Sequence, residues 1–247
     1  MRIAVAGGTG AIGRHIVRAA RGRGHETVVL TRSTGADLYT GTGIDERLEG
    51  VEAVIDVTSV QTMSANRSID FFRTVTQHLI TAGRRQGVRH HVALSIIGAK
   101  EAPFSYYAGK EVQEDLVLDQ PNGSVVRSGQ FHEFVAQTMA RTKIGPLYAV
   151  PVMRSQPVAA EEVAAHLLDV ADDSPQGLAP DIAGPEVLLV ADMIRQFIQH
   201  EGGRSRVVSV PFPGGFGTAM RDGTLLPGPG AILGRQTYSA WLSHQRG

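Results

Sequence analysis

The stretch that decides the fold reads Met1-Arg-Ile-Ala-Val-Ala-Gly-Gly-Thr-Gly-Ala-Ile-Gly13. Its apolar residues 3–6 predict a short strand that is buried on both faces. A glycine turn follows, and a helical pattern begins at Ala11. A strand, a glycine turn and a helix in this order let backbone N–H groups approach a diphosphate. The spacing Gly8-x-Gly10-x-x-Gly13 therefore predicts a dinucleotide-binding unit, although a glycine triplet alone also suits a simple tight turn.

The end of the second predicted strand, residues 27–31, bears on the choice of dinucleotide. An NAD-specific fold places a carboxylate here, next to the ribose 2′-hydroxyl. This chain has Arg32 and Ser33 instead, and Arg14 lies in the first turn of the preceding helix. A guanidinium is a natural partner for a 2′-phosphate, so we expect NADP(H) to be preferred over NAD(H). The alternative is that both arginines are solvated surface charges.

Further apolar runs predict an α/β fold of the Rossmann type, with a doubly wound parallel sheet. Strands are expected at residues 53–57, 88–94 and 124–127, with a minimal one at 36–38, and helices between them. Residues 1–155 form the expected Rossmann core of a single domain. Residues 156–247 form mainly a small C-terminal substrate lobe, with helices near 160–171 and 193–198, a strand at 207–210, a glycine-rich loop at 211–217 and a terminal helix.

Two residues of the helix that follows the 88–94 strand suit proton transfer. Tyr106 and Lys110 stand four residues apart, so their side chains share one helix face. A free tyrosine has a pKa of about 10, and a fixed ammonium beside the phenol would lower it. Ser95, at the carboxyl end of the preceding strand, is the third catalytic candidate. The alternative is a surface helix in which Lys110 pairs with Glu114.

The remaining candidate residues lie where the carboxyl ends of the strands would meet a ligand. Asp37 is either near the adenine or an ordinary turn aspartate. After the 124–127 strand, the predicted substrate-pocket residues are Gln130, His132 and Phe134, where a lone histidine is as often structural. The full set expected to bind the dinucleotide is Gly7, Gly8, Thr9, Gly10, Ala11, Ile12, Gly13, Arg14, Arg32, Ser33, Asp37, Val57, Thr58, Ser59, Lys110, Gln130 and Phe131.

Composition excludes several other classes of function. Lys plus Arg and Asp plus Glu both number 24, so no overall field would attract nucleic acid or an acidic membrane. Cysteine is absent, and the adjacent His90 and His91 would point to opposite faces of a strand, so we expect no metal site. The first strand starts too early for a signal peptide, and no apolar run reaches the ~20 residues of a membrane span. We therefore expect a cytoplasmic protein.

Several segments, taken in order, resemble the atypical short-chain dehydrogenase/reductases of the NmrA-like, NAD(P)H-binding group. They are Gly7-Gly-Thr-Gly-Ala-Ile-Gly13, Val54-Ile-Asp-Val57, Ala93-Leu-Ser-Ile-Ile-Gly98, Tyr106-Tyr-Ala-Gly-Lys-Glu-Val-Gln-Glu114, Arg127-Ser-Gly-Gln-Phe-His-Glu-Phe134, Pro157-Val-Ala-Ala-Glu-Glu-Val-Ala164 and Ala183-Gly-Pro-Glu186. The resemblance covers nearly the whole chain. It implies a Rossmann domain with a C-terminal substrate lobe, and it implies that Ser95, Tyr106 and Lys110 form the family's Ser/Tyr/Lys group.

Three functions are compatible with these features. The first is an NADPH-dependent oxidoreductase that reduces a small carbonyl or quinone-like molecule, with Tyr106 as the acid. The second is a non-catalytic NADP(H) sensor that regulates a protein partner. The third is an NAD-dependent sugar-nucleotide epimerase or dehydratase, and the missing acid at Arg32 and the short C-terminal half argue against it.

Overall fold

The computed structural model describes residues 1–245, which fall into two compact units. The first unit contains residues Met1–Arg127 and Ala160–Pro180. The second contains Ser128–Ala159 and the chain from Asp181 onwards. The units are therefore interleaved along the sequence, and the predicted division near residue 155 into a core and a substrate lobe stays a prediction about function.

A parallel sheet forms the centre of the first unit. Its strands are β1 (Arg2–Ala6), β2 (Glu26–Leu30), β3 (Ala53–Asp56), β4 (His90–Ile96) and β5 (Gly123–Ser128), in the order β2-β1-β3-β4-β5. Strand β1 pairs in parallel with β2 and β3, and β3 pairs in parallel with β4. The short β9 (Gly177–Leu178) pairs in parallel with β5. The predicted parallel sheet is confirmed, with strand ends within two residues of those expected.

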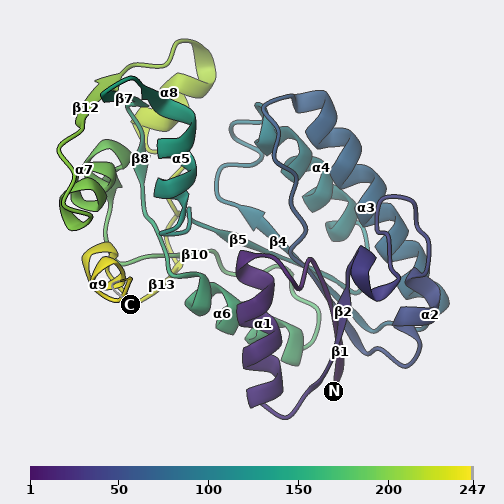
Figure 1. Ribbon diagram of the computed structural model, residues 1–247. Coiled ribbons are helices and arrows are strands. Elements are labelled where there is room, and N and C mark those ends of the chain that lie inside the picture. Colours follow the sequence, from purple (N-terminus) through teal and green to yellow (C-terminus); the bar gives the residue numbers. More distant parts are fainter. Residues whose placement is uncertain (246–247) are drawn as a thin grey trace. The chain divides into compact units, whose positions relative to one another are not determined.

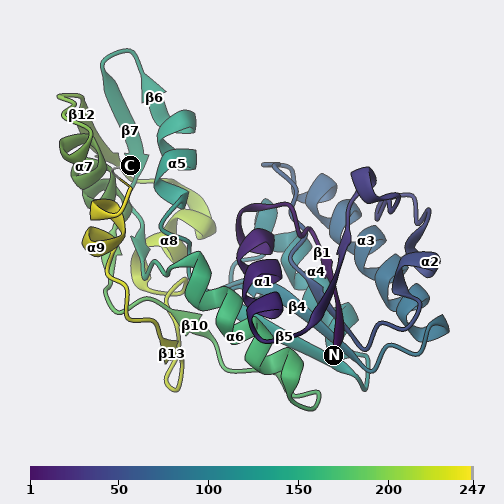
Figure 2. The same cartoon turned by 60° about the horizontal axis from the view of Figure 1, so that its bottom comes forward.

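Helices cover both faces of this sheet, as a doubly wound fold requires. Helix α1 (Ala11–Gly22) packs beside α6 (Ala160–Asp172) on one face, and α3 (Ala65–Arg85) packs beside α4 (Tyr106–Leu118) on the other (Figures 1 and 2). The short α2 (Ile44–Leu48) contacts α3. Apolar residues at helical spacing make these contacts, such as Phe72, Val75 and Leu79 on α3, which are all buried.

The strand order indicates where a ligand would bind, which is at the carboxyl ends of β1 and β3. From β1 the chain goes to β2 on one side, and it then crosses to β3 on the other side. Ligands of open α/β sheets bind at such a reversal, because the loops leaving the two strands diverge there. The two loops start side by side, since a Cβ on Gly7 would lie 2.9 Å from the carbonyl oxygen of Val57.

The second unit, as far as residue 245, contains smaller sheets and four helices. Strands β6 (Lys143–Ile144), β7 (Leu147–Pro151) and β12 (Arg206–Val210) form one sheet, and β8 (Arg154–Ser155) pairs with β11 (Leu188–Leu189). Strand β10 (Ile182–Ala183) pairs in parallel with β13 (Ile232–Leu233). The helices in the described part of this unit are α5 (Phe134–Thr142), α7 (Val190–His200), α8 (Gly214–Asp222) and α9 (Tyr238–Ser243).

Two local predictions differ from the structure. Residues 36–38 form no strand of the sheet, because Asp37 instead makes an isolated antiparallel bridge to Thr42 within a tight turn. The segment 211–217 is not all loop, because α8 begins at Gly214. Gly217 lies in this helix where a Cβ would be only 1.8 Å from the carbonyl oxygen of Phe212, so close packing explains this glycine.

Two further observations concern the described residues as a whole. None of their helices combines the length and the apolar character that crossing a membrane requires. Between residues 1 and 245, no three His, Asp or Glu side chains are grouped so as to hold a metal ion. The predicted histidine pair lies in β4, where His90 Nε2 is 2.8 Å from the hydroxyl of Ser124.

Candidate functional site

The loop between β1 and α1 is shaped by its glycines. Gly10 N–H donates to the carbonyl of Gly7 at 2.9 Å, and Gly7 has a φ of +83°, which favours glycine. A Cβ on Gly13 would lie 2.2 Å from the oxygen of Gly7, so the helix can approach the loop only without a side chain there. Gly10 precedes α1, and no described side chain caps this 12-residue helix. The loop therefore leaves backbone N–H groups for an anion, and it fits the diphosphate of a dinucleotide.

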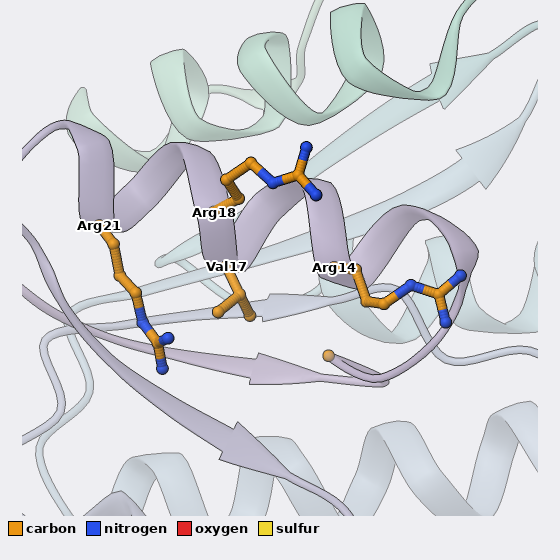
Figure 3. Close-up of a pocket in the computed structure, with 5 residues that line it drawn as sticks. Arg14, Val17, Arg18 and Arg21 are labelled. Carbon is orange, nitrogen blue, oxygen red and sulfur yellow. The ribbon is translucent and has the colours of Figure 1, made fainter. Parts of the chain in front are cut away.

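A cavity of about 350 Å³ lies along α1 beside this loop, and its lining residues are Gly8, Arg14, Val17, Arg18 and Arg21. Figure 3 shows the guanidinium of Arg14 close to the glycine loop, with Arg21 towards the other end of the helix. Arg14 donates to the carbonyl of Thr9 at 3.2 Å. Helix α1 contains no acidic residue, so the cavity is positively charged and suits an anionic group.

The end of β2 carries the two residues predicted to select the dinucleotide. Arg32 and Ser33 are exposed in a short 3₁₀ helix, Arg32–Thr34. The hydroxyl of Ser33 lies 2.9 Å from that of Thr31. Asp37, further on, accepts the backbone N–H of Tyr39 at 2.9 Å, as a turn aspartate does. Its contact with a cofactor stays a prediction, as do those of Arg32 and Ser33.

Helix α4 presents Tyr106 and Lys110 on one face, as their spacing predicts. The phenol oxygen of Tyr106 lies 3.2 Å from the hydroxyl of Ser59, which is exposed just beyond β3. Lys110 is buried, and its ammonium donates to the carbonyl of Leu94 and to Gln113, both at 2.8 Å. The ammonium also lies 4.2 Å from the ring centroid of Phe72 and 5.9 Å from that of Tyr106. The structure thus brings Tyr106, Ser59 and Lys110 together at the end of β3.

Close packing between α3 and α4 holds this face in place. A Cβ on Gly109 would lie 2.2 Å from the hydroxyl oxygen of Ser68 and 2.6 Å from the Phe72 ring. Ser68 in turn donates its hydroxyl to the carbonyl of Tyr106 at 2.9 Å. The glycine between Tyr106 and Lys110 therefore allows the two helices to approach.

Burial shifts the proton affinities of both groups. It lowers the pKa of Lys110 to about 8, against the attraction of Asp56 and Glu114. It raises the pKa of Tyr106 to about 12, and the charge of Asp56 adds to this, while the hydrogen bond with Ser59 acts in the opposite direction. The sequence-based expectation of a lowered phenol pKa therefore differs from the structure, because burial raises this pKa and the ammonium of Lys110 is directed at Leu94 and Gln113.

Ser95 has a different partner from the one its predicted role requires. Its buried hydroxyl donates to Glu114 at 2.6 Å. The same carboxylate accepts two hydrogen bonds from Arg127, at 2.9 and 2.6 Å. The structure therefore directs Ser95 into a buried ion pair, and the hydroxyl beside the phenol is that of Ser59.

The predicted pocket residues after β5 belong to the second unit. His132 is fully buried there, with its ring centroid 5.7 Å from that of Tyr238 and 5.6 Å from that of Trp241. Its Nε2 lies 3.3 Å from the carbonyl oxygen of Gln236. These contacts place His132 in the core of its unit, and its predicted role in a substrate pocket stays a prediction.

The neighbours of His132 are less enclosed. Gln130, Phe131 and Phe134 are half-buried. The carbonyl of Gln130 accepts the N–H of Val158, and Phe131 bridges to the same residue. Their predicted roles towards cofactor and substrate stay predictions.

Comparisons with known proteins show what part of the first unit is similar to. Residues 3–114 match the model of the NAD dependent epimerase/dehydratase family. This region is therefore similar to the NAD-binding part of that family. The matched residues run from β1 into α4, so they include the glycine loop, Ser59, Tyr106 and Lys110.

One curated relative and several solved structures are also similar to this chain. The photosystem II assembly factor Ycf39 of Synechocystis sp. is 32% identical over 119 residues, which cover 42% of this chain and only 36% of that protein. MoeE5 in complex with UDP-glucuronic acid and NAD superposes with a TM-score of 0.70 at 16% identity, over 98% of this chain and 93% of that one. A dTDP-4-dehydrorhamnose reductase of Clostridium acetobutylicum gives a TM-score of 0.69 at 14% identity, over 85% and 84%.

These comparisons confirm the resemblance to atypical short-chain dehydrogenase/reductases of the NmrA-like group. At such low identities the two solved structures show a shared Rossmann-type fold and nothing about substrate.

Two residues of the matched region were missed by sequence reasoning. Asp56 and Gln113 are fully buried, and they contact each other beside Lys110. One signal was available, because Asp56 is an acid inside the apolar run 53–57, and buried charges require partners. Gln113 lies three residues after Lys110 on the same helix, where a side chain can reach it.

Proposed function

We propose that this protein is an NADPH-dependent oxidoreductase that reduces a small carbonyl or quinone-like substrate, with Tyr106 as the proton donor. The observation that carries the proposal is the contact of the half-buried phenol with the exposed hydroxyl of Ser59. This pair lies at the end of β3, and the residue after β3 packs against Gly7 of the glycine loop. An acid beside a dinucleotide-binding loop suits reduction of a carbonyl.

Each residue has a defined task in this reaction. Bound NADPH would supply the hydride. The N–H groups of the glycine loop would hold the diphosphate, and Arg14 and Arg32 would bind the 2′-phosphate. Tyr106 donates its proton to the substrate oxygen, and Ser59 orients that oxygen. Lys110 keeps a positive charge near the developing negative charge.

The proton affinity of Tyr106 favours reduction over the sugar-nucleotide alternative. With a pKa of about 12 the phenol carries its proton at neutral pH, as a donor must. An epimerase that first oxidises a sugar hydroxyl needs the phenolate as a base. The family name and the UDP-sugar complexes of MoeE5 support this second candidate, NAD-dependent sugar-nucleotide epimerisation or dehydration. The exposed Arg32, in place of an acid, argues against it.

A non-catalytic NADP(H) sensor with a protein partner is the third candidate. A sensor needs the glycine loop and the arginines, but it has no use for a proton on Tyr106. The contact between Tyr106 and Ser59 is therefore the feature that favours the reductase over the sensor.

The test measures NADPH oxidation with a panel of ketones, aldehydes and quinones. We expect turnover with at least one compound, and we expect Tyr106→Phe to lower kcat by roughly 10²–10⁴-fold while NADPH affinity is retained. Tyr39→Phe is the matched control, because Tyr39 is exposed and bonds to Asp70. Equal rates for Tyr106→Phe and the unaltered protein would exclude Tyr106 as the acid. Tight NADPH binding with no turnover on any compound would favour the sensor.

A further inference from the structure

Asp56 is a fully buried carboxylate at the end of β3, and each of its oxygens has one donor. Oδ1 accepts the backbone N–H of Thr58 at 2.9 Å. Oδ2 accepts the side-chain amide of Gln113 at 2.8 Å. Lys110 and the buried His91 interact with Asp56 electrostatically, and none of the ion pairs among residues 1–245 includes this carboxylate. A buried charge of this kind is costly unless its hydrogen bonds are retained.

Gln113 connects this carboxylate to Lys110. Its Oε1 accepts the ammonium of Lys110 at 2.8 Å, while its Nε2 donates to Asp56. An ammonium has only donors and a carboxylate only acceptors, so a single orientation of the amide satisfies both. Asp56, Gln113 and Lys110 therefore form a directional network, which we call the Asp56 network, with the negative charge at one end and the positive charge at the other.

The same carboxylate also holds the loop that carries Ser59. Thr58, which donates to Asp56, directly precedes Ser59, and the backbone around Val57 and Thr58 packs against Gly7. One oxygen of Asp56 thus faces the Ser59 loop, and the other faces Gln113 and Lys110. Ser59 and Lys110, the two groups near Tyr106, are therefore both linked by hydrogen bonds to the region held by Asp56.

We propose that Asp56 and Gln113 are positioning residues, which hold Ser59 and Lys110 near Tyr106 through the polarity of the Asp56 network. The relevance to reduction rests on the proposed function, but the network can be tested without turnover. What matters in this proposal is the order of donors and acceptors. Side chains of the same size with the opposite polarity should fail.

Three near-isosteric variants separate polarity from size. Asp56→Asn leaves the network one acceptor short, because asparagine has a single side-chain oxygen. Its NH₂ group must then face another donor, either the amide of Gln113 or the N–H of Thr58. Gln113→Glu places a second carboxylate against Asp56, and like charges repel. The double variant D56N/Q113E restores every donor–acceptor pair: the introduced amide donates to the introduced carboxylate, and that carboxylate accepts the ammonium of Lys110.

The composition of the chain makes a direct measurement possible. It has only three lysines, Lys100, Lys110 and Lys143, so NMR of protein labelled with ¹³C at lysine Cε can follow Lys110 alone. The charged groups that face its ammonium are Asp56 from β3 and Glu114 from α4. The rings of Phe72, on α3, and Tyr106, on α4, complete its surroundings.

We expect Asp56→Asn to move the titration midpoint of Lys110 down by about one pH unit, and the thermal midpoint to fall with it. In D56N/Q113E the titration midpoint of Lys110 and the thermal midpoint should both return to or exceed those of the unaltered protein. The carboxylate introduced at position 113 then contacts the ammonium of Lys110 directly. Asp115→Asn is the control: Asp115 pairs with the exposed Lys100, so this change should leave Lys110 unmoved. NADPH fluorescence titration adds a second readout, with weaker binding in Asp56→Asn and recovery in the double variant.

The proposal is overturned if Lys110 titrates in Asp56→Asn as in the unaltered protein, or if the double variant is no better than Asp56→Asn. Should Asp56→Asn not fold, Gln113→Glu is compared with the double variant, which must be the more stable of the two. A double variant that fails to fold where Asp115→Asn folds also contradicts the proposal. These readouts use protein without substrate, so a lack of turnover would count against the reductase alone.

Discussion

The phenol oxygen of Tyr106 lies 3.2 Å from the hydroxyl oxygen of Ser59. Ser59 follows β3, whereas the serine expected beside the tyrosine, Ser95, lies in β4 and donates to Glu114. Ser59, expected only among the dinucleotide-binding residues, is therefore the exposed hydroxyl beside the phenol, and Ser95 supports a buried ion pair.

This difference can be tested with two single substitutions. We expect Ser59→Ala to lower kcat by about tenfold or more with little effect on stability, because it removes an exposed hydroxyl beside the phenol. Ser95→Ala should cost about 1–3 kcal/mol of unfolding free energy, because it removes a donor from the buried carboxylate of Glu114. Steady-state kinetics and urea unfolding of both variants provide the check. The assignment is wrong if Ser95→Ala alone affects kcat.

Arg32 is the residue whose replacement should change the preference between dinucleotides. We expect Arg32→Asp to weaken NADPH binding by about tenfold to a hundredfold, since a charge-assisted contact is worth roughly 1.5–3 kcal/mol. NADH binding should change much less. Fluorescence titration measures both affinities, with Arg73→Asp, an exposed change on α3, as the control. Equal affinity of the unaltered protein for NADPH and NADH would contradict the predicted selectivity.

Lys110 should make stability depend on pH in a defined direction. Its pKa is about 8 when folded against 10.5 in the free side chain, so between these values the unfolded chain binds more protons. The contribution of Lys110 to the free energy of unfolding therefore becomes more favourable as the pH rises across this window. Below pH 8 the buried ammonium is charged in both states, and its full destabilising effect is present. Relative to Lys110→Met, we expect the unaltered protein to gain about 2–3 kcal/mol between pH 7 and pH 10.

Urea unfolding of both proteins at the two pH values checks this, and the exposed Lys143→Met is the control. A difference between the unaltered protein and Lys110→Met that stays constant with pH would show that Lys110 titrates normally.

Local patterns in the sequence predicted much of the first unit. The apolar run before Gly7, the glycine spacing and the four-residue interval from Tyr106 to Lys110 each depend on neighbours along the chain. Whether Ser59 or Ser95 lies beside Tyr106 does not depend on such neighbours, because it is decided by which strand end faces α4. The raised pKa of Tyr106 is likewise a result of burial by packing, which sequence spacing does not encode.

The second unit was harder to predict for a physical reason. Strands β6, β8 and β10 have two residues each, too few to show an alternating pattern. His132 was placed near a substrate because it follows β5, but its aromatic neighbours Tyr238 and Trp241 come about a hundred residues later. Contacts of such long range leave no local trace in the sequence.

The interleaving of the two units has a consequence for how this protein can be divided or recombined. Helix α6 lies beyond residue 155 in the sequence, yet it packs against α1, and its residues Val163, Leu167 and Leu168 are buried. A fragment ending at residue 155 would lose this cover and present apolar surface to water, a cause of aggregation. Exchanging the second unit for that of a relative would need three junctions, near residues 127, 159 and 180. The second unit of this chain is therefore not a detachable module.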